Sequence, residues 1–260
     1  MNYSEVQLSV VIVCTNEKKF LRPALLSVVA SLRGMPSEII VVDNNSSDGS
    51  RELIRTEFPQ VLLIENPKNR GAAYARNLGI QKAQGEHLLF LDCDTEVLDN
   101  AVQKLIDYIK THPEIGILSP QLLYPDHTVQ HSSRPFPTVL TFIRRVLEGD
   151  FKFLWRRKNF ETSWNHSSTR EVDWTMSAAW LIPRAVLEKV GEFDDGYFYN
   201  YEDVDLSWRI KKAGWKIVYY PEAQVIHHYQ RLSARGGFSN PLKWAHLKSA
   251  LRFFIKKAFS

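Results

Sequence analysis

The sequence has few cysteines, no long apolar run and no strong excess of charge. Cys14 and Cys93 are the only cysteines in 260 residues, which excludes a disulfide scaffold and favours a reducing, cytoplasmic compartment. No apolar stretch approaches the roughly 18–20 residues of a membrane-spanning helix, so we expect none. The N-terminus carries Glu5 ahead of its apolar run and lacks the basic start of a signal peptide. The net charge of +4 is too small to indicate a nucleic-acid partner.

Two common phosphate-binding patterns are also missing. The chain has neither a Walker-type GxxxxGK[ST] loop nor a GxGxxG turn, so ATPase and dinucleotide-dehydrogenase activities have no support. Hydrophobic residues make up 44% and charged residues 24%, which is ordinary for a globular chain with a substantial core. The length fits one large domain or two closely packed ones.

Apolar runs alternate with helical periodicity in the first half of the chain. We expect strands at residues 8–14, 38–42, 61–65, 87–91 and 115–119. Predicted helices lie between them at 20–32, 51–58, 69–83, where Asn69 is the expected cap, and 100–111. This alternation favours an α/β fold with a doubly wound, mostly parallel sheet. Later we expect a strand at 171–182, a short helix at 188–191, a helix at 201–213, a strand at 215–221 and a helix from 241.

Polar or acidic residues follow three of the predicted strands. They lie at 14–17, 43–47 and 92–94. In open parallel sheets, ligands bind beyond the carboxyl ends of the strands. Because all three segments lie at such ends, we expect them to form one site.

Asp92 and Asp94 follow the fourth predicted strand, and carboxylates at this spacing reach one cation if the strand ends in a turn. Carboxylate oxygens suit Mg²⁺ or Mn²⁺, which also bind phosphate oxygens. A bare D-x-D pattern is common, so a solvated loop that caps the next helix is the alternative. His227 and His228 follow the last predicted strand, where an imidazole can ligate a metal or cap the edge of the core.

Two further segments suit a nucleotide. Asp43 ends its strand, where a carboxylate can accept hydrogen bonds from a base or ribose, although an Asx turn explains it equally well. Residues 69–71 (Asn-Arg-Gly) precede a helix, so exposed N–H groups, the helix dipole and a guanidinium together suit phosphate. Arg76 and Asn77 lie further along, where either faces the same pocket or adds surface charge.

Glu202, Asp203 and Asp205 lie at the predicted start of a helix, where the helix dipole by itself favours acidic residues. Asp205 is spaced for an i,i+4 pair with Arg209. The preceding residues, 193–201, are both acidic and aromatic. Carboxylates held among aromatic rings lose hydration, which suits a general base.

Four segments together resemble the family 2 glycosyltransferases, which have the GT-A fold. They are VVIVCTNE, VVDNNSSDGS, NRGAAYARNLGIQKAQGEHLLFLDCDTEV and FDDGYFYNYEDVDLSWRIKKAGWKIVYYPEAQVIHH. The resemblance covers nearly all of residues 8–233. It implies a single GT-A domain with a nucleotide-sugar (donor) half at 1–119 and an acceptor and catalytic-base half at 120–233. A C-terminal basic amphipathic helix follows at 234–260.

The chain is most similar to the rhamnosyltransferase-like branch of this family. LYPDHTVQHSSRPFPT resembles a segment that commonly reads D-G-x-x-Q…R-x-F-P, and VDWTMSAAWLIPR resembles one that usually reads D-W-x-x-G-A…R-R. The chain departs from these patterns at His127, Ser177 and Pro183. The departures fall on the acceptor side and leave the donor-side motifs intact.

The resemblance implies roles for individual residues. On the donor side, Asp43 would contact the nucleobase. The neighbours implied for the nucleotide are Thr15, Glu17, Arg70, Asn77 and Asp92. Asp94 and Asp92 would hold Mg²⁺ or Mn²⁺ against the diphosphate.

On the acceptor side, the same resemblance implies that Asp203 is the catalytic base and that Glu202 lines the acceptor pocket. His227 would complete the metal shell, with His228 as the alternative because the sequence doubles there.

The implied reaction is inverting transfer of a sugar, L-rhamnose from dTDP-rhamnose or the sugar of a UDP-sugar, to a glycan or lipid-linked acceptor of cell-surface polysaccharide synthesis. Nucleotidyl transfer is an alternative that predicts a more basic, glycine-rich first loop, which the chain lacks. A non-catalytic sugar-nucleotide or polysaccharide binding module would be expected to lose the D-x-D or E-D carboxylates, and both are present.

The tail from residue 241 has the pattern of a basic amphipathic helix. The apolar residues expected on one face are Trp244, Leu247, Leu251, Phe254, Ile255 and Ala258. The flanking cations are Lys243, Lys248, Arg252, Lys256 and Lys257. Such a helix suits the anionic inner face of the cell membrane. Packing on the catalytic domain or on a second subunit of a homodimer is the alternative. The basic and aromatic segment 144–158 repeats the theme and favours a lipid-linked acceptor.

Overall fold

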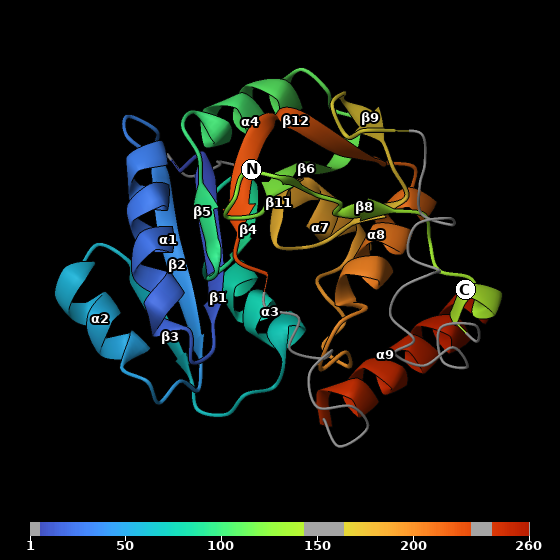
Figure 1. The fold of residues 1–260 in the computed structure, drawn as a ribbon, viewed down its shortest axis with the longest axis horizontal. Helices are drawn as coiled ribbons and strands as arrows, with labels where there is room; N and C mark the ends of the chain where they lie inside the picture. The colour runs from blue at the N-terminus through green and yellow to red at the C-terminus, as the bar shows by residue number, and fades with distance from the viewer. Residues whose placement is uncertain (1–5, 143–163, 230–240, 260) are drawn as a thin grey trace.

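A central sheet with helices on both faces makes up the fold of residues 6–142, 164–229 and 241–259, the part that this computed structural model describes (Figure 1). The strands are β1 (Leu8–Cys14), β2 (Ser37–Asn44), β3 (Leu62–Asn66), β4 (His87–Asp92), β5 (Thr95–Val97), β6 (Ile115–Leu123), β7 (Val129–Gln130), β8 (Ser133–Arg134), β9 (Arg170–Glu171), β10 (Trp174–Thr175), β11 (Ala179–Pro183) and β12 (Lys216–His227). The helices are α1 (Lys18–Ser31), α2 (Ser50–Glu57), α3 (Ala72–Lys82), α4 (Ala101–Lys110), α7 (Arg184–Val190), α8 (Glu202–Lys212) and α9 (Pro241–Ala258).

The part of the sheet formed by β1 to β4 is parallel, which confirms the prediction. β1 pairs in parallel with β2 and with β4, and β2 pairs in parallel with β3. β11 then joins antiparallel to β4, and β12 runs parallel to β6. Cys14 is in register with Asp43, and Val13 with Asp92. The polar ends of three strands therefore meet at one edge of the sheet.

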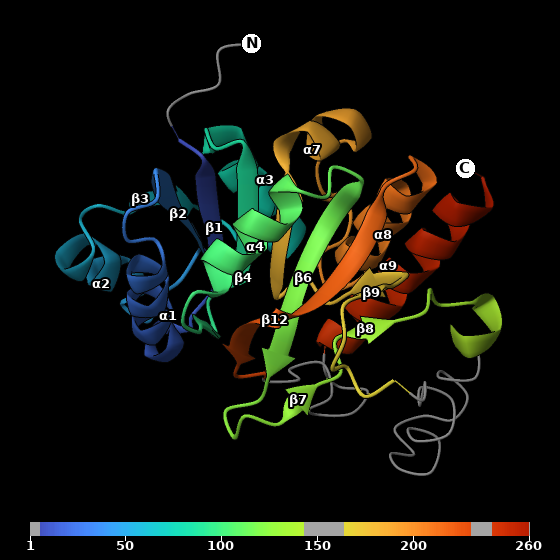
Figure 2. The same cartoon turned by 90° about the horizontal axis from the view of Figure 1, so that it is seen from above.

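Alternating side chains of β1 pack into two apolar layers, one on each face of the sheet. Val10 and Ile12 pack in the layer that contains α1, α2 and α4, whereas Val11 packs in the layer that contains α3, α7 and α8 (Figure 2). All three valine and isoleucine side chains are at most 1% exposed. A strand covered by helices on both faces needs such a continuous apolar run.

Two strand predictions were wrong in their extent. The strand expected over residues 171–182 is broken into β9, β10 and β11, because β9 pairs with β12 while β10 pairs with β8. The last strand does not stop at Pro221 but continues to His227. A register shift between Tyr220 and Gln224 accommodates the proline, which has no N–H to donate to the sheet. This extension carries His227 to the polar edge of the sheet.

Helix α3 begins after Gly71, so the prediction that Asn69 caps it was wrong. Asn69 Oδ1 accepts hydrogen bonds from the Gly71 N–H at 2.9 Å and from Asn44 Nδ2 at 2.8 Å. Gly71 has a φ of 93°, and a Cβ there would lie 2.4 Å from the backbone oxygen of Phe198. Glycine therefore allows the loop that precedes α8 to pack on the start of α3.

Helix α9 packs on the C-terminal half of the domain, through Phe254 of the predicted apolar face but mainly through residues outside that face. Ala250 and Phe253 are buried against Tyr201. The residues of the predicted apolar face that are most exposed are Trp244, Leu251 and Ile255. The helix thus has a buried inner face and an outer face that is both apolar and basic.

Two expectations from the sequence concern the membrane. The basic and aromatic segment 144–158 lies outside the described residues. Across the described ranges, none of the helices combines the length and apolar character that a bilayer span requires.

Candidate active site

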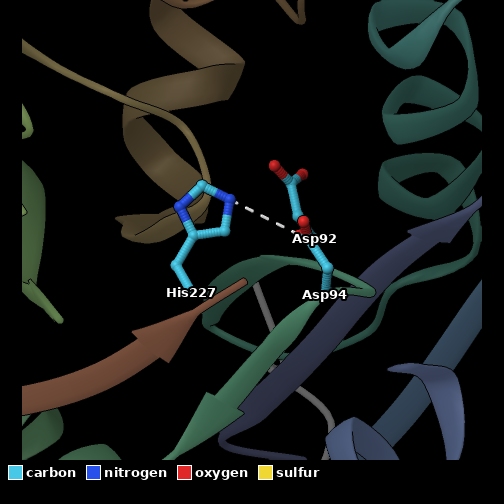
Figure 3. Close-up of side chains that lie close together, drawn as sticks. All are labelled: Asp92, Asp94 and His227. Carbon is cyan, nitrogen blue, oxygen red and sulfur yellow. Dashed lines mark ion pairs between the residues drawn. The ribbon is translucent and has the colours of Figure 1, made fainter. Parts of the chain in front are cut away.

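Three potential metal ligands meet at the polar edge of the sheet. Asp92 ends β4, Asp94 lies in the turn that follows, and His227 ends β12 (Figure 3). One ligand atom from each lies within 4.8 Å of the others. The turn is closed by a 2.7 Å hydrogen bond from the Thr95 hydroxyl to the Asp92 carbonyl, and the His228 N–H donates to the Asp94 carbonyl at 2.9 Å. Two carboxylates and an imidazole are a donor set that fits Mn²⁺ or Mg²⁺.

The two adjacent histidines have different surroundings. His227 Nε2 lies 3.5 Å from Asp94 Oδ1, and its ring is 4% exposed. His228 Nε2 instead lies 2.6 Å from Glu96 Oε1, and its ring packs against Phe20. The structure therefore brings His227, and not His228, to the carboxylates of the D-x-D turn.

Arg76 links the Asp92–Asp94 turn to the acidic start of α8. The residue is 2% exposed, and its guanidinium lies 2.8 Å from Asp92 Oδ1 and 3.1 Å from Glu202 Oε1. Two carboxylates compensate the burial of this cation. The sequence left open whether Arg76 faces the pocket or adds surface charge, and the structure buries it. The sequence does indicate this burial, because Arg76 lies at helical spacing from Ala73 and Ile80, which face the core.

Asp203 is a partly buried carboxyl group near the start of α8. Burial, followed by the negative charge of Glu202, raises the pKa of Asp203 to about 7. The Val204 N–H, Arg76 and Arg134 act in the opposite direction. Asp203 stands at the start of α8 directly after Glu202, which Arg76 holds in place. A carboxyl group with this pKa exchanges protons readily near neutral pH.

Asp43 is fully buried at the end of β2. Its Oδ1 accepts hydrogen bonds from Arg51 Nε at 2.5 Å and from the Ser46 N–H at 3.0 Å. Its Oδ2 is also buried and has no hydrogen-bond partner among the described residues. Arg51 was not predicted, because its contact depends on how α2 folds back over the end of β2.

Glu17 and Thr15 follow β1 at the same edge of the sheet. Glu17 Oε2 accepts a hydrogen bond from Cys93 Sγ at 2.8 Å, so this carboxyl group points toward the D-x-D turn. Burial raises the pKa of Glu17 to about 7, and the charges of Asp94 and Asp92 act in the same direction. Thr15 is partly exposed directly after the strand.

Arg70 and Asn77, both expected near the nucleotide, have different positions. Arg70 is half exposed, lies 3.7 Å from the ring centre of Tyr74 and pairs weakly with Asp195. Asn77 exchanges two hydrogen bonds with the backbone of Phe193, at 2.8 and 3.0 Å. The Asn77 amide thus holds the loop before α8.

Helix α9 also holds this loop. Asp194 accepts hydrogen bonds from Arg252 at 2.8 Å and from Lys256 at 3.0 Å. Against the effect of burial, these cations lower the pKa of Asp194. Lys256 also lies 2.8 Å from the buried carboxylate of Asp205. Helix α8 and the loop before it are therefore held between α3 and α9.

A family model described as glycosyl transferase family 2 matches residues 9–191. The chain is 30% identical over 237 residues to N-acetylglucosaminyl-diphospho-decaprenol L-rhamnosyltransferase of Mycobacterium tuberculosis (strain ATCC 25618 / H37Rv). This alignment covers 85% of the chain and 76% of the relative. The chain belongs to glycosyl transferase family 2 and is rhamnosyltransferase-like, as its motifs predicted.

Solved structures confirm the GT-A fold. GalNAc-T7, crystallised with UDP, GalNAc and Mn²⁺, superimposes with a TM-score of 0.65 at 21% identity, over 86% of this chain and 44% of that one. A mannosyltransferase from Pyrobaculum calidifontis, in complex with GDP-Man and Mn²⁺, gives 0.64 at 18% identity, over 98% of this chain and 64% of that one. At these identities the likeness concerns the fold alone.

Proposed function

Proceeding from membership of this family, we propose that the chain transfers a sugar, with inversion, from a nucleotide diphosphate-sugar to a hydroxyl of a glycan or lipid-linked acceptor. The observation that carries the proposal is the group formed by Asp92, Asp94 and His227, which Arg76 joins to the acidic start of α8. L-Rhamnose from dTDP-rhamnose is the first candidate donor, because the mycobacterial relative is named a rhamnosyltransferase. A UDP-sugar is the alternative.

Asp203 supplies the base that inversion requires. An acceptor hydroxyl is a poor nucleophile near neutral pH, so a carboxylate must take its proton as it attacks the anomeric carbon. With a pKa of about 7, Asp203 is ionised in about half of the molecules at pH 7 and still holds a proton firmly once it has taken one. Glu202, fixed by Arg76, keeps the charge of this region negative and lines the acceptor side.

The residues at the other end of the site bind and orient the leaving group. Asp94, Asp92 and His227 would hold Mn²⁺ or Mg²⁺, which when bound neutralises the charge that develops on the departing diphosphate. Arg76 fixes the Asp92 carboxylate through its 2.8 Å contact. Arg70 offers a half-exposed guanidinium just before α3, where the helix dipole favours phosphate.

Asp43 fits the nucleobase. Arg51 and the Ser46 N–H hold Oδ1, whereas Oδ2 has no partner among the described residues and can accept a further hydrogen bond. The imide N–H of thymine or uracil supplies such a donor. Both bases present the same group, so this carboxylate accommodates dTDP and UDP alike and does not choose between them.

The outer face of α9 supports attachment to an anionic membrane surface, where a lipid-linked acceptor would lie. The helix carries five lysine and arginine residues and no acidic residue, and two of these cations, Arg252 and Lys256, pair with Asp194. On this face Trp244, Leu251 and Ile255 are 56%, 57% and 52% exposed. Apolar side chains beside cations are the pattern of an interfacial helix. A homodimer formed through the same face is the competing outcome.

Vesicle flotation tests the proposed membrane attachment of α9. We expect the protein to float with vesicles that contain phosphatidylglycerol, and a Leu251→Ser/Ile255→Ser variant to partition at least about tenfold less. Leu26→Ser/Leu62→Ser is the matched control, since these leucines are 48% and 46% exposed on the donor half. Unchanged flotation together with dissociation of a dimer in sedimentation would assign the face to a second subunit.

Calorimetric titration tests the donor site. dTDP, UDP and GDP are added separately, each with and without Mn²⁺. We expect one nucleotide to bind tightly only when Mn²⁺ is present, and Asp94→Asn to abolish that dependence. A dTDP preference favours the rhamnosyl donor, and a UDP preference favours the alternative. Metal-dependent binding without any sugar transfer to lipid-linked or glycan acceptors would favour a binding module, and no binding at all would overturn the proposal.

A further inference from the structure

A buried hydrogen bond ties the metal-binding edge to β7. Gln130 Oε1 lies 2.7 Å from His227 Nδ1, although the two residues are 97 positions apart in the chain. Gln130 is 2% exposed and His227 is 4% exposed, so water does not compete for this contact. Gln130 is placed there by the antiparallel pairing of β7 with β6, in which Gln130 stands opposite Leu122.

The orientation of the Gln130 amide bears on which imidazole nitrogen carries the proton. With its oxygen facing the ring, Nδ1 is the nitrogen that donates, and the Gln130 Nε2 is buried without a partner among the described residues. In a neutral imidazole, Nε2 then has a free lone pair. This lone pair faces Asp94 Oδ1 at 3.5 Å, a distance beyond a good N–H···O hydrogen bond.

Two electron-rich atoms that face each other repel unless a cation lies between them. Ligands about 2.1 Å from one ion and separated by about 90–110° lie roughly 3.0–3.4 Å apart. The 3.5 Å between Nε2 and Oδ1 is close to that spacing. The reversed arrangement, in which Nε2–H donates to Asp94, would call for a shorter contact.

We propose that Gln130 is a positioning residue that holds His227 in its Nδ1–H tautomer, with the Nε2 lone pair directed at the cation of the Asp92–Asp94 turn. The inference rests on the proposed function, which supplies the cation. Gln130 itself does not touch the metal. It orients a ligand, as hydrogen-bond acceptors behind metal-binding histidines commonly do.

The test replaces Gln130 with methionine, which has a similar length and no amide. We expect the dissociation constant for Mn²⁺ alone, measured by electron paramagnetic resonance of the free ion, to rise about 10–100-fold. Gln121→Met is the matched control. Gln121 is also buried, and its amide bonds to Tyr219 Oη and the His166 carbonyl at 3.0 Å each. We expect this control to bind Mn²⁺ within about twofold of wild type.

Long-range ¹H–¹⁵N correlation on the metal-free protein at pH 8 gives a second readout. In wild type the His227 signals should show a protonated Nδ1 and an unprotonated Nε2, and in Gln130→Met a mixture of tautomers. A protonated Nε2 in wild type, unchanged Mn²⁺ affinity in Gln130→Met, or an equal loss in Gln121→Met would each overturn the inference. If wild type binds no Mn²⁺, the proposed metal site fails first and the inference fails with it.

Discussion

Removal of Arg76 should lower the free energy of unfolding by an amount that depends on pH. Arg76→Met preserves the volume of the side chain but leaves Glu202, whose side chain is 8% exposed, without its counter-charge. Removal of one partner of a buried ion pair typically costs about 3–5 kcal/mol. The Asp92 side chain is 37% exposed and regains water, so the loss of its pair with Arg76 contributes little to the loss of stability. We therefore expect a loss of about 3 kcal/mol in the free energy of unfolding near pH 8.

The sign of the pH dependence follows from the carboxyl group. Without Arg76, an ionised Glu202 is buried without a counter-charge, so the loss of stability is present only while this carboxylate is ionised. Protonation at low pH removes the penalty, whereas the penalty grows as the pH rises. In wild type, protonation of the carboxylates at low pH leaves Arg76 buried without counter-charges. This further reduces the difference in the free energy of unfolding between wild type and Arg76→Met.

Urea unfolding of wild type and Arg76→Met at pH 4 and pH 8 measures this effect. The loss at pH 8 should exceed the loss at pH 4 by about 2 kcal/mol or more. The double variant Arg76→Met/Glu202→Gln is the control, since a neutral amide removes the stranded charge and should restore part of the stability at pH 8. An equal loss at both pH values, or no recovery in the double variant, would refute the ion-pair argument and point to lost packing alone.

The other predictions concern the base, the loop before it and the clamp on that loop. Asp203→Asn should lower kcat by about 10²–10⁴-fold with nucleotide affinity unchanged, and kcat/KM of wild type should rise with pH through about 7, measured by initial rates. Gly71→Ala should cost about 1–3 kcal/mol in thermal unfolding, because its Cβ meets the Phe198 backbone, while Gly34→Ala, with open space around it, should cost less. Arg252→Ala should lower kcat more than donor affinity, measured by steady-state kinetics beside calorimetry; equal losses in both would contradict the clamp.

The local pattern of the chain was enough for much of the donor half. Its parallel strands are continuous apolar runs, and such runs are visible without knowledge of their partners. Asp43 and Asp92 directly end such runs, so the topology rule for parallel sheets placed both at one edge, as the structure confirms. The motifs from residue 8 to residue 233 were sufficient to identify the family.

The sequence by itself thus determined the fold class, the donor-side strand ends and the family. The tertiary structure alone decided which polar side chains face each other. The extension of β12 brought His227, rather than His228, to Asp94. The packing of α3 places Arg76 between the carboxylates of Asp92 and Glu202. It also places the Asn77 amide against the backbone of Phe193. These contacts join residues up to about 130 positions apart, so they depend on strand register and helix packing, which short-range periodicity does not encode.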